Sequence, residues 1–125
     1  MAPYEKLSGL EDLYLEDSWV LEIDAGPDHL HFTVDAVMAE SHPAWRPRKS
    51  NEQYSCLPVE ICFDSTTSLD FRASEWPLAV DATGATDYGH IDAFTWEGDR
   101  YQLEGDWGSA IVVGPKPTVR ALPEA

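Results

Sequence analysis

The chain has 125 residues, of which 43% are hydrophobic and 25% are charged, and these are ordinary proportions for one globular domain. The charge balance is unusual, because 23 acidic residues against eight Lys and Arg give a formal net charge of −15. A surface of this kind repels phosphate, which argues against binding to nucleic acid and against adsorption to an anionic membrane. We therefore expect a single domain over residues 1–125, with neither nucleic acid nor membrane as a partner.

The acidic excess is greatest in the first 45 residues, where Lys6 is the only base. This stretch contains ten acids: Glu5, Glu11, Asp12, Glu16, Asp17, Glu22, Asp24, Asp28, Asp35 and Glu40. Such a surface speeds encounters with a basic protein or a cation, and it does so in a salt-dependent way. The alternative is that the charge only maintains solubility.

The N-terminal sequence MAPYEKLSGLED lacks the basic and apolar regions of a secretory signal, and no apolar run reaches membrane-spanning length. We therefore expect a cytoplasmic protein. Cys56 and Cys62 are the only cysteines, and their spacing matches no zinc or redox motif. We expect reduced thiols, with a disulfide between the two as the alternative.

The first half of the chain has the pattern of β-strands, interrupted by prolines and glycines. Residues 4–15 suit a helical turn or a strand. Residues 19–24 and 30–38 alternate on either side of the turn sequence Gly26-Pro27-Asp28, which predicts a hairpin. The alternation of its first strand places three residues on one face: Trp19, Leu21 and Ile23.

Residues 40–58 carry three prolines and no periodicity, which predicts a long irregular loop of the kind that often binds a ligand. The loop contains a cluster of bases, Arg46, Arg48 and Lys49, directly after Trp45. Tryptophan beside arginine is typical of binding hot spots, so Trp45, Arg46 and Arg48 are candidate binding residues. The alternative is that Trp45 packs into the core and tethers the loop.

The second half of the chain continues the strand pattern. Residues 59–64 and the pair Leu69 and Phe71 predict a second hairpin, and residues 76–87 predict an irregular connection. The sharpest signal is Gly98-Asp99, because glycine at the first central position suits a two-residue type II′ turn. Short strands at residues 110–113 and 118–122 follow. About seven to eight strands with little helix predict a mainly β domain, either an antiparallel two-layer sandwich or a closed barrel.

The turn at Gly98-Asp99 fixes a register for the hairpin around it. The predicted pairs are Glu97 with Arg100, Trp96 with Tyr101, Phe94 with Leu103 and His90 with Trp107. One face of this hairpin is then predicted to enter the core: His90, Asp92, Phe94, Trp96, Tyr101, Leu103 and Trp107.

One group of polar residues is predicted to gather at the far end of this hairpin, beside Trp107: Asp81, Asp87, His90, Asp92 and Asp106. Carboxylates near a histidine are what general acid–base catalysis or a divalent-cation site needs. The spacing fits no calcium-binding loop. The alternative is that the aspartates and glycines shape turns, while His90 and Asp92 bond to backbone groups.

Other catalytic chemistry has no support in the sequence. There is no G-x-S-x-G elbow and no Gly-rich phosphate loop, and no histidine is predicted to lie beside Cys62. His29 and His31 share one side of a strand, as a metal site would need, but no third ligand is predicted nearby. We therefore expect no cofactor and favour a non-enzymatic protein.

Four segments resemble a group of small uncharacterised bacterial proteins: LEDLYLEDSWVLEI (residues 10–23), SHPAWRP (41–47), DATGATDYGHIDAF (81–94) and LEGDWG (103–108). This resemblance implies a bacterial cytoplasmic protein of one domain, and it implies no activity, ligand or catalytic residue. In size and acidity alone the chain also resembles bacterial immunity proteins, which neutralise basic toxins.

These observations lead to three hypotheses about function. The first is an acidic interaction protein whose N-terminal surface meets a basic protein partner such as a toxin. The second is a β domain that binds a small ligand or a divalent metal at the Asp/His group, with hydrolytic activity as one variant. The third is a structural subunit of a homo-oligomer.

Overall fold

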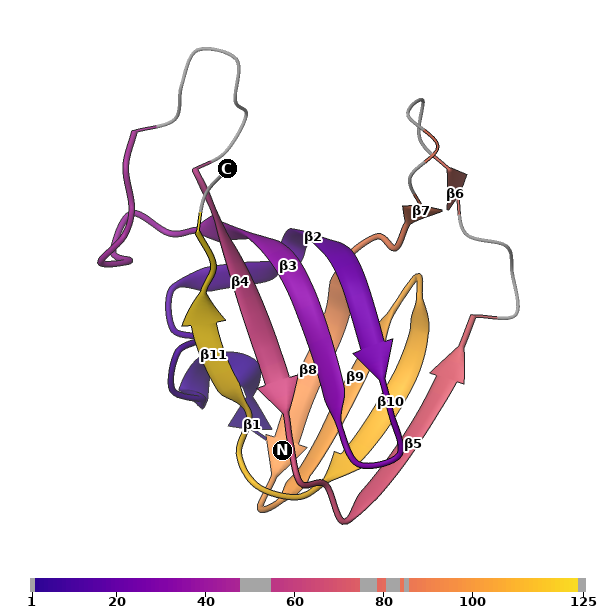
Figure 1. Ribbon diagram of the computed structural model, residues 1–125. Helices are drawn as coiled ribbons and strands as arrows, with labels where there is room; N and C mark the ends of the chain where they lie inside the picture. Colours follow the sequence, from indigo (N-terminus) through magenta and orange to yellow (C-terminus); the bar gives the residue numbers. More distant parts are fainter. Residues whose placement is uncertain (1, 48–54, 75–78, 81–83, 85, 124–125) are drawn as a thin grey trace.

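The computed structural model describes residues 2–47, 55–74, 79–80, 84 and 86–123, which form two antiparallel sheets facing each other (Figure 1). The five-stranded sheet has the order β1 (Ala2–Pro3), β8 (Ile91–Glu97), β9 (Arg100–Gly105), β10 (Gly108–Val113) and β5 (Ser68–Ala73). The four-stranded sheet has the order β11 (Thr118–Ala121), β4 (Cys56–Phe63), β3 (Leu30–Met38) and β2 (Leu13–Ala25). The described residues also include a 3-10 turn, η1 (Tyr4–Lys6), and a two-stranded ribbon of β6 (Ala79–Val80) and β7 (Thr86–Asp87).

The predicted two-layer sandwich is therefore confirmed, and the alternative of a closed barrel is wrong, because no hydrogen-bonded strand pair among the described residues joins the two large sheets. The predicted helical turn near the N-terminus corresponds to η1, while Leu13 and Leu15 belong to β2. Residues 76–87, predicted as an irregular connection, contain the short β6–β7 ribbon.

Aromatic side chains from both sheets meet in the core. Phe63 of β4 packs edge-on against Tyr101 of β9, with ring centroids 5.3 Å apart. Phe32 of β3 lies 5.0 Å from Trp107, which stacks on Phe71 of β5 at 5.8 Å. Contacts of this geometry add to the hydrophobic stabilisation from buried area, so the aromatic residues fix how the two layers face each other.

The hairpin at Gly98-Asp99 has the predicted register over most of its length. Glu97 pairs with Arg100, and the pairing continues unbroken to Ala93 opposite Glu104. Gly98 has a φ of +60°, as a type II′ turn requires at its first central position. The turn chemistry read from the sequence is therefore correct.

The far end of the same hairpin differs from the prediction, because a bulge at Asp92 shifts the register by one residue. Ile91 pairs with Gly105 and is 1% exposed, whereas Asp92 lies in solvent. A bulge inserts one unpaired residue and reverses the side-chain direction beyond it. His90 therefore does not lie opposite Trp107, and Asp92 is not on the core face.

The inner face of β2 also differs from the prediction. Trp19 and Leu21, predicted to point inward, are 38% and 53% exposed. Leu13, Leu15 and Val20 are buried instead. Register shifts between Tyr14 and Trp19 and between Val20 and Glu22 change the phase of the strand twice, so a single alternation does not describe β2.

Backbone groups along the outer edge of β2 are bonded to two other parts of the chain. The Tyr4 hydroxyl accepts a hydrogen bond from the Leu15 amide (3.0 Å) and lies 2.9 Å from the Leu13 carbonyl and 2.7 Å from a Glu16 carboxylate oxygen. Farther along, the Val20 amide donates to the Gly89 carbonyl (2.9 Å). These contacts cover part of an edge that would otherwise be open to pairing with another strand.

The Tyr4 hydroxyl makes a testable contribution to stability. We expect Tyr4→Phe to lower the free energy of unfolding by about 1–3 kcal/mol, because the buried Leu15 amide loses its acceptor. Burial and the neighbouring Glu16 raise the pKa of Tyr4 above its ordinary value of 10. The folded state therefore holds this proton more tightly than the unfolded chain does. The contribution of Tyr4 to stability is fully present below pH 10 and is lost as the pH rises further.

Urea unfolding at neutral pH and at about pH 11 measures both effects. Tyr14→Phe is the control, because Tyr14 is 45% exposed and its substitution is expected to change stability by less than about 0.5 kcal/mol. Tyr101 is also buried with a raised pKa, so it too lowers the stability at high pH. Tyr4→Phe should therefore reduce the stability lost between neutral pH and pH 11 without abolishing that loss. An unchanged neutral stability in Tyr4→Phe would contradict the role of the hydroxyl.

Candidate functional site

The predicted Asp/His group is brought together in part, around Gly89. The Asp87 carboxylate accepts a hydrogen bond from the Gly89 amide (2.9 Å), and the Asp106 side chain lies directly against Gly89. His90 donates through Nδ1 to the Ser18 carbonyl (2.5 Å), and Trp107 donates through Nε1 to the His90 carbonyl (3.2 Å). Asp92 is exposed at its bulge, and Asp81 lies outside the described residues.

The contacts of these side chains favour the structural interpretation. The hydrogen bonds of Asp87, His90 and Trp107 all go to backbone groups that join β2, the turn before β8 and the β9–β10 connection. Elsewhere among the described residues, one group of side chains has ligand atoms close enough together to hold a metal ion. None of the residues of the predicted Asp/His group belongs to it. Metal binding or hydrolysis at the Asp/His group stays a prediction.

The predicted binding loop, residues 40–58, is described at residues 40–47 and 55–58, and it ends earlier than predicted because β4 begins at Cys56. Trp45 is partly buried against the core, and its amide donates to the His42 carbonyl (3.0 Å). Arg46 is half-buried, whereas Arg48 and Lys49 lie outside the described residues. The position of Trp45 agrees with the interpretation that this tryptophan tethers the loop.

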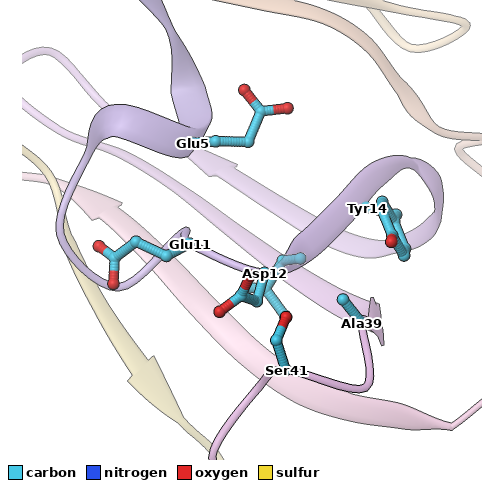
Figure 2. Close-up of a pocket in the computed structure, with 7 residues that line it drawn as sticks. Glu5, Glu11, Asp12, Tyr14, Ala39 and Ser41 are labelled. Atoms are coloured by element: carbon cyan, nitrogen blue, oxygen red, sulfur yellow. The ribbon is translucent and has the colours of Figure 1, made fainter.

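A hollow of about 270 Å³ opens where the N-terminal segment meets the residues after β3. Seven residues line it: Glu5, Glu11, Asp12, Leu13, Tyr14, Ala39 and Ser41. Glu11 and Tyr14 lie on opposite sides of the view in Figure 2, with Asp12 between them and Glu5 above. We call this feature the acidic hollow, because it carries three exposed carboxylates and none of its lining residues is a base.

Backbone bonds hold the acidic hollow in shape. The Ala39 amide donates to the Asp12 carbonyl (2.9 Å), which ties the end of β3 to the start of β2. Asp12 has a φ of +60°, a left-handed conformation that aspartate tolerates better than most residues. The Glu11 carboxylate accepts from the Gly9 amide (2.9 Å). The backbone around Glu11 and Asp12 is therefore held in place by hydrogen bonds.

Large hydrophobic residues are also exposed on β2. Tyr14, Trp19 and Leu21 are the large hydrophobic side chains that the described part of the chain exposes to solvent. Acidic residues on the same strand are exposed beside them: Glu16, Asp17 and Glu22. We call Tyr14, Trp19 and Leu21 the β2 apolar row. Tyr14 belongs to both the row and the acidic hollow, so the two features adjoin.

A second polar group lies on the outer face of the four-stranded sheet. His31 of β3 pairs directly with Cys62 of β4, and Glu60 lies on the same face two residues before Cys62. The Cys62 thiol donates to Glu60 Oε1 (3.0 Å), and Arg120 of β11 donates to the same oxygen through Nε (3.0 Å). His31 Nε2 lies 2.7 Å from an Asp64 carboxylate oxygen.

Burial and the neighbouring carboxylate of Glu60 raise the pKa of the Cys62 thiol to about 12. The hydrogen bond from that thiol, together with those from Arg120, lowers the pKa of Glu60. Neither Cys56 nor Cys62 forms a disulfide, as expected from the sequence.

The sequence interpretation missed this second group. It recognised that His29 and His31 share a side of β3, but it placed no histidine near Cys62 and no third ligand near His31. The residues that complete the group come from β4, which a long loop separates from β3. Alternation within each strand predicts the face of each residue but does not fix how the two strands align.

No protein-family model matches the chain, and no similar curated protein or solved structure is found. The resemblance of four segments to small bacterial proteins therefore stays a prediction. Among the described residues, no helix has the length and apolar character needed to cross a lipid bilayer.

Proposed function

We propose that this protein is a non-enzymatic interaction protein that binds a basic protein partner through the acidic hollow and the β2 apolar row. The observation that carries the proposal is the hollow itself, which is lined by Glu5, Glu11 and Asp12 together with Tyr14, a side chain that is 45% exposed. Three carboxylates and an aromatic ring are suited to a lysine or arginine side chain, which they attract by charge and by cation–π contact.

The net charge of −15 supports the same proposal at longer range. Charges of one sign accelerate the diffusional encounter with a partner of opposite sign, whereas close contacts determine how long the complex lasts. Nine of the ten N-terminal acids are exposed, and Asp35 is half-buried. The N-terminal part of the chain therefore supplies both the long-range attraction and the hollow.

The β2 apolar row gives the proposed interface a hydrophobic part. Binding energy at protein interfaces comes largely from a few aromatic and aliphatic anchors, with polar residues around them. Tyr14, Trp19 and Leu21 provide such anchors on one strand, and exposed acids flank them. A partner with basic residues around an apolar patch is complementary to this arrangement.

The proposal is tested with a lysine-rich peptide that includes two aromatic residues, measured by fluorescence anisotropy at several salt concentrations. We expect binding that weakens steeply between about 0.01 and 0.15 M salt, because the Debye length falls from about 30 to 8 Å. The triple variant Glu5→Gln, Glu11→Gln, Asp12→Asn should bind about tenfold more weakly, since each surface ion pair contributes up to about 1 kcal/mol.

The matched control is the triple variant Asp24→Asn, Asp28→Asn, Asp99→Asn, which removes the same number of charges. These exposed acids lie at or beyond the other end of β2 or in the β8–β9 turn, and none of them lines the acidic hollow. We expect the control to weaken binding by less than about threefold. Equal losses in the two triple variants, or affinity that does not respond to salt, would contradict a role for the hollow.

A further inference from the structure

We propose that His31, Glu60 and Cys62 form a binding site for a transition-metal ion of the Zn²⁺ class on the outer face of the four-stranded sheet. Their ligand atoms, one nitrogen, one oxygen and one sulfur, all lie within 4.8 Å of one another. This inference is independent of the proposed binding of a basic partner, because it concerns a different face and a different ligand.

The sheet itself brings the three side chains together. Residues two apart on a strand point to the same side, which places Glu60 beside Cys62. The antiparallel register of β3 and β4 then sets His31 directly opposite Cys62. Two paired neighbouring strands therefore hold the three ligands. In a zinc site with metal–ligand bonds of about 2.0–2.3 Å, ligand atoms lie about 3.5 Å from one another. Rotation of the three side chains supplies this small movement.

The donor types match a borderline-soft cation. Imidazole and thiolate ligands favour Zn²⁺ and Co²⁺, whereas Ca²⁺ and Mg²⁺ prefer sites made of oxygen alone. On binding, the Cys62 thiol releases its proton to solvent and a sulfur–metal bond forms. The thiolate and the Glu60 carboxylate then balance the double positive charge of the ion. His31 and Glu60 are half-buried, so the fourth position of a tetrahedral site faces solvent.

Neighbouring residues are placed to support these ligands. The 2.7 Å contact between His31 Nε2 and Asp64 gives the ring a carboxylate partner and leaves Nδ1 as the nitrogen that can bind the ion. The hydrogen bonds of Cys62 and Arg120 to Glu60 use Oε1, so Oε2 can bind the ion while Arg120 keeps its place. Such carboxylate–histidine pairs orient the ligand in many zinc proteins.

The test uses the full chain, first by thermal melting with Zn²⁺ and then by absorption spectroscopy with Co²⁺. We expect Zn²⁺ at about 100 times its Kd to raise the melting temperature by about 5–10 °C, while Mg²⁺ and Ca²⁺ leave it unchanged. Co²⁺ should give the charge-transfer absorption of a thiolate–cobalt bond. Cys62→Ser should lose this absorption, and His31→Gln should lower the affinity for Co²⁺ tenfold or more.

Two matched controls assign the effect to this site. Cys56→Ser removes the other thiol, and Asp106→Asn alters the predicted Asp/His group, so both should bind Zn²⁺ and Co²⁺ like the unaltered protein. The absence of a Zn²⁺ shift, or a cobalt–thiolate band that survives in Cys62→Ser, would overturn the proposal. A shift that disappears in Asp106→Asn and persists in His31→Gln would assign the metal to the other group instead. If Cys62→Ser does not fold, His31→Gln decides the question alone, because this half-buried side chain is not part of the core.

Discussion

Replacing Trp107 with alanine is expected to lower the free energy of unfolding by about 3–5 kcal/mol, a large share of the total for a domain of this size. Trp107 is 2% exposed and contacts aromatic rings of both sheets, Phe32 on β3 and Phe71 on β5. The truncation would leave a cavity between the two layers and would also remove the hydrogen bond to the His90 carbonyl. Urea denaturation followed by circular dichroism measures the loss.

Trp19→Ala is the matched control for this substitution. The sequence pattern predicts that both tryptophans face the core, but Trp19 is 38% exposed on β2. We expect its replacement to lower the free energy of unfolding by less than about 1.5 kcal/mol, since much of the ring already contacts water. Equal losses in the two variants would mean that β2 keeps the alternation read from the sequence, and the β2 apolar row would then not exist.

Gly108→Ala is expected to destabilise the protein by roughly 2–6 kcal/mol. This range is the sum of two costs, that of a strained backbone and that of an overpacked contact. Gly108 has a φ of +134°, and a methyl group there would overlap the backbone carbonyl of Arg72 on the neighbouring strand β5. Backbone on a paired strand cannot move aside as a flexible side chain can. The substitution should therefore loosen the pairing of β5 with β10 at this end.

The control for Gly108 is Gly98→Ala in the β8–β9 turn. Gly98 also has a positive φ, +60°, but a Cβ there would meet no atom within 4 Å. Only the left-handed conformation then carries a cost, about 1–2 kcal/mol. Hydrogen exchange of the β5 amides separates the two effects, because protection should fall in Gly108→Ala and stay unchanged in Gly98→Ala. Similar losses in both variants would contradict the steric argument.

The two proposed sites are far enough apart to be altered separately. The acidic hollow adjoins Ala39, just beyond the last residue of β3, whereas His31 is the second residue of that strand. At about 3.3 Å per residue, roughly 25 Å separates them along β3. A variant of Glu5, Glu11 and Asp12 should therefore leave metal binding intact, and His31→Gln should leave the binding of a basic peptide intact.

Where the sequence interpretation of the fold was correct, the signal was local. The turn at Gly98-Asp99 requires a residue that adopts positive φ, and glycine supplies it, so both turn type and register near Trp96 and Tyr101 follow from adjacent residues. The predicted hairpin of residues 59–64 with Leu69 and Phe71 is wrong, because β4 and β5 lie in different sheets. Where the predicted face of a strand was wrong, a bulge changed the phase. Pairs of adjacent exposed residues mark these places, such as Asp92 and Ala93 on β8 and Leu21 and Glu22 on β2.

The bulges could not be read from the sequence because apolar residues occupy both phases of β2. Trp19 and Leu21 continue the odd-numbered alternation of Leu13 and Leu15, whereas Tyr14 and Val20 place apolar side chains in the even-numbered phase. The choice between the phases depends on contacts with distant residues. Ser18 fills a buried position in the first irregularity, where its hydroxyl donates to the Tyr14 carbonyl and accepts from the Val37 amide of β3.

The sequence by itself determined the strand-rich character, the acidic surface and the tight turn, because each depends on composition or on residues adjacent in the chain. Only the tertiary structure decided that the sheets form a sandwich, that Trp19 and Leu21 face solvent, and that His31 lies opposite Cys62. These features depend on how strands align across long connections, and that alignment is set by packing between residues far apart in the chain.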